Sequence, residues 1–401
     1  MPSFKYKAMS KSGEKIESVY TANTKEDVLV MMRSNNYYPL KIEEVVEGTN
    51  IDSNLFVRVK TKDIAIFCRQ FYTMLNAGAT ISMCLSILGQ QITNKKLKNS
   101  VISVDEHVRK GLTFSEALKK QGNIFPDLFI NMVNSGEVSG TLDTIMSRMA
   151  EHYEKESKIN NKVKGAMVYP TILGIISIGV VIGMLTFVMP IFVGMFKDNG
   201  VVLPLPTKML LGASSFLKTF WYLFIIIVFG IAFILNYYFK TENGQVFLSR
   251  VKLTLPILKN INEKIIVSRF TRTLSTVLAS GVNLIQALQV VSKVLGNKII
   301  ESKVMEVREQ MMKGGVLSEP LTKAGFFPPM LCSMIKIGEE SGSLDEILDK
   351  TADFYDDELD TAIQQFTSIL EPLMILFMGV VIGFMVISML LPMFDMYNNI
   401  K

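Results

Sequence analysis

Apolar residues gather in three long stretches of the chain that contain no Asp, Glu, Lys, Arg or His. These stretches are residues 171–194, 219–239 and 372–394. At about 1.5 Å of rise per helical residue, each is long enough to cross a hydrocarbon core of roughly 30 Å. The pattern therefore predicts three transmembrane helices, with a loop over residues 197–218 between the first two.

Two further parts of the chain have the spacing of amphipathic helices. In residues 61–165, Ile64, Phe67 and Phe71 begin a series of apolar positions three and four residues apart. Residues 262–371 show the same pattern. Glycines separate the apolar runs in both parts, so we expect two bundles of several short helices.

The first 50 residues follow a mixed pattern. Phe4 and Ala8 belong to an alternating segment, residues 16–20 can form a return strand, and Thr24 can cap a short helix. Residues 1–50 are therefore predicted to form a small α/β module. The expected fold class is a mostly α integral membrane protein with two duplicated cytoplasmic bundles, three transmembrane helices and this N-terminal module.

The bundles are copies of one another. Short segments of the first copy recur 202 positions later, and upstream segments recur at a spacing of 203. The matched pairs include Phe125-Pro126 with Phe327-Pro328, Gly136-Glu137 with Gly338-Glu339, Leu142-Asp143 with Leu344-Asp345, and Arg69 with Arg272. A register held over this length predicts that both bundles have the same fold.

The order of bundles and spans predicts the topology. Each copy runs into a span, and the unpaired stretch 219–239 returns the chain to its first side, so both bundles face the same side. Residues 1–47 are polar and lack the apolar core of a signal peptide. Lysines before the first span and basic residues after the second favour the cytoplasm. We therefore expect a multi-pass protein of the cytoplasmic (inner) membrane with a cytoplasmic N-terminus.

Composition narrows the function classes. Hydrophobic residues make up 49% of the chain, which agrees with a membrane protein. The net charge is only +5, and Lys and Arg are not gathered in one stripe, so nucleic acid is a poor candidate partner. The three cysteines form no CxxC pair and lie in segments expected on the cytoplasmic side, where thiols stay reduced.

The most specific local motif is Gly-Glu-x-Ser-Gly-x-Leu-Asp, which occurs in both copies. In the structural interpretation, which we favour, glycines end one helix and hydroxyl side chains cap the next. The residues expected in those roles are Gly136, Gly338, Thr141 and Ser343. In the functional interpretation, Glu137 and Glu339 contact a partner or a cation.

The two copies differ in charge just before their spans. The first copy is basic there and the second is acidic, with Lys155, Lys158, Lys162 and Lys164 in one and Asp349, Asp353, Asp356, Asp357, Glu358 and Asp360 in the other. These runs are interpreted as solvated helix faces. Alternatively, one copy faces lipid headgroups and the other a basic protein.

Catalytic signatures are absent from the sequence. There is no GxxxxGK[ST] phosphate loop and no HExxH motif, and His107 and His152 are expected at the surface or at helix caps. We therefore predict a non-enzymatic protein with no metal and no cofactor. The spans also lack the ionisable groups of ion and proton pathways, which disfavours a small-molecule transporter, the main alternative, and a membrane protease.

One segment points to a family. Lys162-Val163, Ala166-Met167, Tyr169-Pro170 and Val188-Met189-Pro190 resemble the signature of polytopic inner-membrane platform proteins of type IV pilus and type II secretion machines, the PilC/GspF-like family. The second copy departs from it, since Glu371-Pro372 stands where the first has Tyr169-Pro170. Pro170 and Pro372 are expected either to kink the helices that enter the membrane or merely to mark helix boundaries.

The resemblance implies a scaffold for assembly of pilus or pseudopilus filaments. Its implied partners are a cytoplasmic assembly ATPase, pilin or pseudopilin transmembrane helices, inner-membrane assembly proteins, the lipid bilayer and further copies of the same chain. The candidate contact residues are Glu137, Glu339, Arg69, Arg272, Asp356, Asp357 and Glu358. The residues that mark where the chain enters and leaves the membrane are Lys162, Tyr169, Pro170, Pro190, Glu371 and Pro372.

Overall fold

The structure is a computed structural model, and the residues that it describes are 3–9, 15–22, 24–34, 37–45, 58–198 and 204–399. They divide into two compact units, which are treated separately. The first unit is Met1–Val59 with Thr93–Leu97, and the second is Lys60–Ile92 with Lys98–Lys401.

The first unit contains a three-stranded antiparallel sheet of order β2-β1-β3 and one helix. The elements are β1 (Ser3–Met9), β2 (Lys15–Thr21), α1 (Lys25–Ser34) and β3 (Tyr38–Val45). Thr24 caps α1, because its Oγ1 accepts from the Asp27 N–H at 3.3 Å. Strand β3 was not predicted, since its partner is the first strand of the chain and that pairing is not visible in local periodicity.

The first bundle contains six helices around an aromatic core. Phe71 and Phe114 stack with ring centroids 5.2 Å apart, and both are buried. The helices are α2 (Thr61–Asn76), α3 (Ile81–Gln91), α4 (Lys95–Arg109), α5 (Phe114–Lys119), α6 (Asp127–Ser139) and α7 (Leu142–Ala166).

The second bundle repeats the first helix by helix. Phe270 and Phe327, which match Phe67 and Phe125 of the first copy, contact each other with centroids 4.7 Å apart. The helices are α12 (Pro256–Leu278), α13 (Leu284–Val294), α14 (Lys298–Met312), α15 (Ser318–Ala324), α16 (Pro329–Ser341) and α17 (Leu344–Asn399). The duplication seen in the sequence is therefore a duplication of fold.

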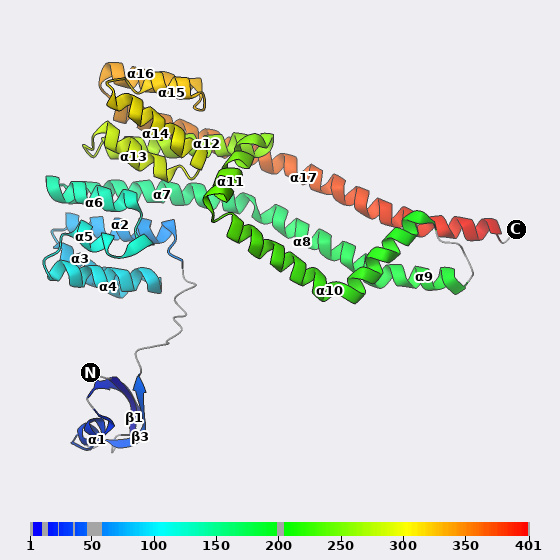
Figure 1. Cartoon of the computed structure of the whole chain (residues 1–401), viewed down its shortest axis with the longest axis horizontal. Helices are drawn as coiled ribbons and strands as arrows, with labels where there is room; N and C mark the ends of the chain where they lie inside the picture. Colours follow the sequence, from blue (N-terminus) through cyan, green and yellow to red (C-terminus); the bar gives the residue numbers. More distant parts are fainter. Residues whose placement is uncertain are drawn as a thin grey trace. The chain divides into compact units, whose positions relative to one another are not determined.

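Within the described residues, two helices are long and apolar enough to cross a membrane, namely Leu142–Phe192 and Leu344–Pro392. The first consists of α7, α8 (Val168–Gly183), a π-helical turn (Met184–Val188) and α9 (Met189–Asp198). The second is the single helix α17. Figure 1 shows α8 and α17 leaving the bundles in the same direction.

The third predicted span falls in α10 (Leu205–Tyr238), which α11 (Glu242–Thr254) follows. In the part of α10 that the structure describes, the apolar stretch is the shorter segment Phe229–Tyr238. The predicted loop 197–218 is partly wrong, because helix α10 already begins at Leu205. The backbone departs from helical geometry at Phe220 (φ −118°, ψ 24°), and Figure 1 shows α10 bent.

Pro170 and Pro372, the prolines where the chain enters the membrane, have different effects on the helix in the two copies. In the first, α7 ends at Ala166 and α8 begins at Val168, so the break precedes Pro170. In the second, α17 continues through Pro372 without interruption. The predicted kink at Pro372 therefore has no counterpart as a helix break.

Pro190 and Pro392 lie near the ends of the two long apolar helices, and each leaves a backbone carbonyl without its helical donor. In both places a hydroxyl of α10 donates the missing hydrogen bond. In the π-helical turn Met189 donates to Met184, so the next donor, for the Leu185 carbonyl, would be Pro190, which has no N–H. Ser214 Oγ donates to that carbonyl at 2.5 Å. In α17, Pro392 cannot donate to Ser388, and Thr207 Oγ1 donates to that carbonyl at 2.5 Å.

Candidate functional site

The motif glutamates hold the start of a neighbouring helix in each copy. The Glu137 carboxylate accepts from the Phe114 N–H at 2.5 Å and from the Ser115 N–H at 2.9 Å. Glu339 accepts likewise from Leu317 N–H and, at 3.0 Å, from Ser318 N–H. An anion at the N-terminus of α5 or α15 pairs with amides that have no donor role inside the helix. Glu137 and Glu339 are therefore structural residues first.

The motif glycines are placed differently from the prediction. The left-handed residues that end α6 and α16 are Gly140 (φ 73°) and Gly342 (φ 70°). Gly136 and Gly338 instead lie inside those helices and are buried. A Cβ on Gly136 would meet Ile145 Cγ1 at 2.9 Å, so its role is close packing between α6 and α7.

The hydroxyl cap predicted at Thr141 is also absent. The Thr141 side chain makes no capping hydrogen bond to α7. Its hydroxyl, like that of Ser343, lies within hydrogen-bonding distance of the preceding motif serine, at 2.7 Å in both copies. The motif therefore closes on itself in the turn, and the glutamate makes the long-range contact.

Arg69 and Arg272 form equivalent ion pairs between the first and last helix of their bundles. Arg69 binds both carboxylate oxygens of Glu154, at 2.8 and 2.7 Å. Arg272 binds Asp356 at 2.7 Å, and Asp356 stands 202 positions after Glu154. Hydrogen bonding from Arg69 lowers the pKa of Glu154, although partial burial opposes the shift.

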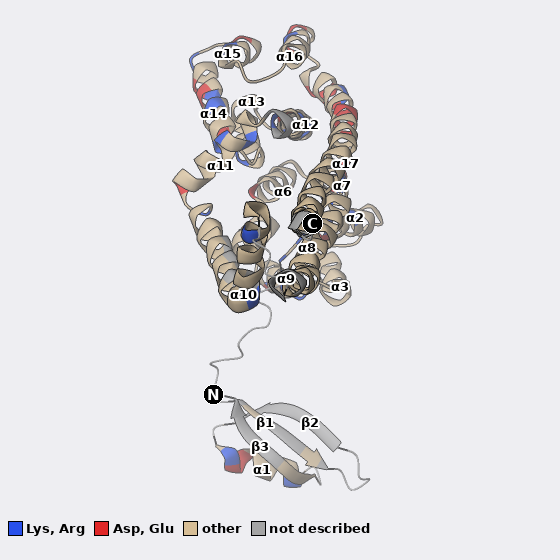
Figure 2. Ribbon diagram, turned by 90° about the vertical axis from the view of Figure 1, so that its right-hand side faces the viewer, with Lys and Arg blue, Asp and Glu red and all other residues tan. Residues whose placement is uncertain are grey.

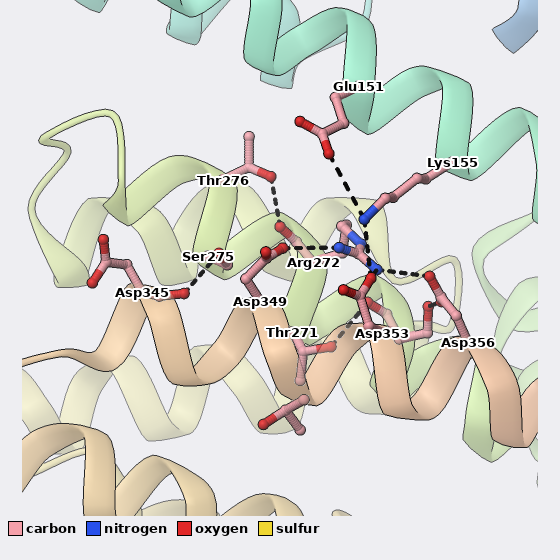
Figure 3. A network of polar contacts seen from close by, with 12 residues as sticks. Glu151, Lys155, Thr271, Arg272, Ser275, Thr276, Asp345, Asp349, Asp353 and Asp356 are labelled. Carbon is pink, nitrogen blue, oxygen red and sulfur yellow. Dashed lines mark hydrogen bonds and ion pairs between the residues drawn. The ribbon is translucent and has the colours of Figure 1, made fainter.

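The two ion pairs differ in burial. The Arg272 side chain is 8% exposed and also binds Asp349 at 2.9 Å and Asp353 at 2.6 Å (Figure 3). Burial alone would raise the pKa of Asp353, but hydrogen bonds from Arg272 and Lys155 outweigh it and lower that pKa. The Arg69 side chain is 43% exposed. One copy thus presents this arginine to solvent, while the other covers it.

The basic and acidic runs face each other. Lys155 of α7 binds Asp353 of α17 at 3.0 Å, and Lys162 binds Asp360. Figure 2 shows the acidic residues along the part of α17 that adjoins the bundle. The divergence of charge between the copies therefore serves, at least in part, to pair them with each other, an outcome that neither sequence interpretation included.

Two of the acidic candidates have partners in the same chain, and one does not. Asp356 binds Arg272, and Glu358 binds Lys264 at 2.5 Å. Asp357 is exposed, and its carboxylate has no ion pair within the part of the chain that the structure describes. Of this group, Asp357 is the residue left open to an external partner.

The residues at the membrane entrance also join the two copies. The Tyr169 hydroxyl donates to Glu371 at 3.2 Å, so the substitution that distinguishes the second copy forms a contact with the first. Pro170 is buried in the first turn of α8, whereas Pro372 is exposed. Pro190 follows the π-helical turn.

His152 is buried, contrary to the expected surface position. Its side chain lies between α7 and α12 beside Arg269 and Arg272, and neither ring nitrogen has a hydrogen-bond partner in the structure. Burial, with these two cations, lowers its pKa to about 4. His107 is half-buried and has its Nδ1 2.7 Å from the Ser103 carbonyl oxygen. In the described ranges, no group of three or more His, Cys, Asp or Glu is placed to hold a metal ion.

A groove of about 620 Å³ runs between α2 and α7 on the exposed side of the first bundle. It contains the Arg69–Glu154 pair and is otherwise basic. Its lining residues are Lys62, Ala65, Ile66, Arg69, Gln70, Glu154, Ser157, Lys158, Asn161 and Lys162. This groove, together with Asp357 on α17, is the open candidate interaction surface.

Known proteins share both the repeat and the N-terminal unit. Residues 67–190 and 270–392 each match the family described as type II secretion system (T2SS), protein F, and residues 1–43 match that protein's N-terminal domain. The chain belongs to this family. The double match also agrees with the two bundles and the helices that follow them.

Full-length relatives come from both kinds of machine. The chain is 37% identical to "Type IV pilus assembly protein PilC" of Thermus thermophilus, covering 100% of both chains. It is 36% identical to the protein of that name from Myxococcus xanthus, covering 99% of this chain and 96% of the relative. It is 28% identical to "Type II secretion system protein F" of Vibrio cholerae, covering 99% of both. The family and the two long apolar helices together indicate an inner-membrane protein of pilus or secretion machinery.

Several residues that organise this site were not predicted from the sequence. Glu154 was not singled out, although its 202-residue counterpart Asp356 is also acidic, which was a usable signal. Ser214 and Thr207 lay in the expected loop and gave no signal, because their role depends on which carbonyls the prolines leave unpaired.

Proposed function

We propose that the protein is a non-enzymatic platform for assembly of a type IV pilus or a type II secretion pseudopilus. In this role it couples a cytoplasmic assembly ATPase to the extraction of pilin-type subunits from the membrane. The observation that carries the proposal is the full-length similarity to pilus assembly and secretion proteins, combined with two bundles joined by the ion pairs Lys155–Asp353 and Lys162–Asp360. A rigid body joined to membrane helices is suited to transmitting a push.

We further propose three transmembrane helices, the third being the 219–239 part of α10. Support comes from the hydroxyls of α10, which bond to the proline-freed carbonyls of Leu185 and Ser388. Such bonds matter most where water is absent, since hydrocarbon offers no substitute donor. With three spans the N-terminal module, 61–165 and 262–371 lie in the cytoplasm, and the spans 171–194 and 372–394 offer surfaces to pilin helices.

Contact with the ATPase and the other assembly proteins is assigned to exposed parts of the bundles. Glu137, Glu339, Arg272, Asp356 and Glu358 contribute by fixing the local fold. Arg69 and Asp357 contribute as exposed charges. A small-molecule transporter is the weaker alternative, because the span segments lack ionisable side chains.

In-cell photocrosslinking tests the proposal. A photoreactive residue at 137 or 339 would break a helix cap, so we place it at the adjacent exposed positions 138 and 340, which match each other in the repeat. Probes are expressed at native level, and products are identified by mass spectrometry. We expect capture of an assembly ATPase or an inner-membrane assembly protein. Capture of neither, from these positions and from position 357, would argue against a platform role.

A further inference from the structure

The two bundles of one chain are held together by a specific interface whose parts exist twice. Helix α7 of the first bundle docks on α12 and α17 of the second. His152, Lys155 and Ile159 on α7 meet a surface of α12 formed by Ser268, Arg269, Arg272 and Thr273. His152 is 4% exposed there, so the contact is close.

Each half of this interface has a counterpart with no partner in the chain. The repeat matches Ser268, Arg269, Arg272 and Thr273 to Ala65, Ile66, Arg69 and Gln70, all of which line the open groove between α2 and α7. It matches His152, Lys155 and Ile159 to Phe354, Asp357 and Thr361 of α17, which are exposed. One chain therefore presents an empty acceptor groove on its first bundle and a free docking face on its second.

We propose that the groove of one copy receives the α17 face of a second copy, so that chains associate head to tail by repeating their internal interface. In that arrangement Phe354 of the second copy takes the place of His152. It packs between Ile66 and the Arg69 guanidinium, as His152 lies beside Arg269 and Arg272. A contact of this kind is heterologous and closes into a ring or continues as a chain of copies.

The exposed residues fit each other in character. Ile66 is 46% exposed and Phe354 is 41% exposed, and both are large apolar side chains. The phenyl face can also stack on Arg69, a favourable arrangement for a cation and an aromatic ring. The contact would thus bury two apolar side chains that the single chain leaves in water.

The charges fit as well, with the polarity reversed from the internal interface. Within the chain, a basic face with Lys155 and Lys162 meets acidic α17. Between chains, the groove supplies Lys62 and Lys158, which form no ion pair among the described residues, beside the Arg69–Glu154 pair and Lys162, which binds Asp360. The incoming α17 face carries the exposed Asp357, and beside it Glu358, which binds Lys264 of its own chain. Strict repetition brings Asp357 near Glu151, a like charge; Lys155 lies 3.8 Å from Glu151 and binds Asp353 at 3.0 Å.

The reversed polarity also sets which face can dock. The basic α7 face of another copy would meet the basic groove, and that juxtaposition is repulsive. The charge divergence between the repeats therefore has two consequences. It pairs the bundles within a chain, and it selects α17 for pairing between chains.

Disulfide crosslinking between two separately tagged full-length chains tests the inference. One chain carries Ile66→Cys and the other Phe354→Cys, so that a mixed dimer reports contact between copies. Membranes are treated with a mild oxidant, and the native chain, with its three buried cysteines, gives the background. The control replaces Ile66→Cys by Val138→Cys, since Val138 belongs to the same bundle and is 85% exposed.

We expect mixed dimers from the 66 and 354 pair at least tenfold above the 138 and 354 control. Equal yields from the two pairs would overturn the inference. So would efficient crosslinking of the Phe354→Cys chain to itself, which marks a symmetric contact. As a second measurement, Phe354→Lys should lower the oligomer mass in nanodiscs, whereas Ile337→Lys, on exposed α16, should not. Neither readout needs filaments, so failure here leaves the platform proposal intact.

Discussion

The capping role of Glu339 gives the sharpest prediction about the fold. Its carboxylate accepts from two backbone amides at the start of α15, and the residues that donate, Leu317 and Ser318, are buried. Glu339→Ala leaves both donors without an acceptor. A hydrogen bond to a charged group contributes roughly 1.5–3 kcal/mol, and Glu339 is only half-buried. We therefore expect a local cost of about 3 kcal/mol.

Hydrogen exchange on the full-length protein in nanodiscs measures this cost where it arises. About 3 kcal/mol corresponds to roughly 100-fold faster opening. We expect that acceleration for the amides of 317–319 in Glu339→Ala, and a smaller one in Glu339→Gln, which keeps one acceptor oxygen. Glu137→Ala should do the same to the amides of Phe114 and Ser115 in the first copy.

Glu340, the residue that follows Glu339, provides a matched control. Glu340 is exposed, and its ion pair among the described residues is with Lys336, at 3.9 Å, so Glu340→Ala should leave the exchange of the α15 amides unchanged. If the amides at the start of α15 exchange at the same rate in Glu339→Ala and Glu340→Ala, the Glu339 carboxylate does not stabilise this helix. The motif would then need another explanation.

Three further predictions concern other parts of the second unit. The pKa of His152 is lowered from 6.5 to about 4, so the unfolded chain binds more protons than the folded chain between these two values. The free energy of unfolding therefore falls by up to about 3 kcal/mol as the pH drops from about 6.5 towards 4. His152→Phe should flatten the profile of thermal stability against pH in that window, and an unchanged slope would contradict the buried position. Thr207→Val and Ser214→Ala remove the donors to Ser388 and Leu185 and should each destabilise the helix assembly in bicelles by about 1 kcal/mol, whereas Ser215→Ala, which loses only a bond within its own helix, should have no effect. Gly136→Ala places a Cβ 2.9 Å from Ile145 and should lower stability by about 1–3 kcal/mol; Gly379→Ala, with open space around it, is the control, and equal unfolding midpoints for the two variants would refute the packing argument.

The parts of the fold that follow from local pattern were predictable. The 202-residue register predicted two bundles of one fold, and the described helices match across the copies. Periodicity likewise predicted helices at Ile64 and Phe71. These features depend only on which residues lie three or four positions apart.

The features that depend on how the helices pack against one another could not be predicted from the sequence. No local rule shows that Lys155 faces Asp353, because the pairing requires knowing which face of α7 lies against which face of α17. The burial of His152 follows from the same docking. Similarly, Gly136 and Gly140 are both plausible helix ends in sequence, and only the approach of Ile145 distinguishes them.

The central claim, that this protein is a filament-assembly platform, is tested most directly by deletion and complementation in cells. Surface filaments and secretion of filament-dependent substrates are measured in the deletion strain, and again after expression of the native chain. The account predicts loss of filaments or of secretion in the deletion strain, with pilin-type subunits retained in the membrane, and recovery on complementation. Unchanged filaments and unchanged secretion in the deletion strain would contradict it.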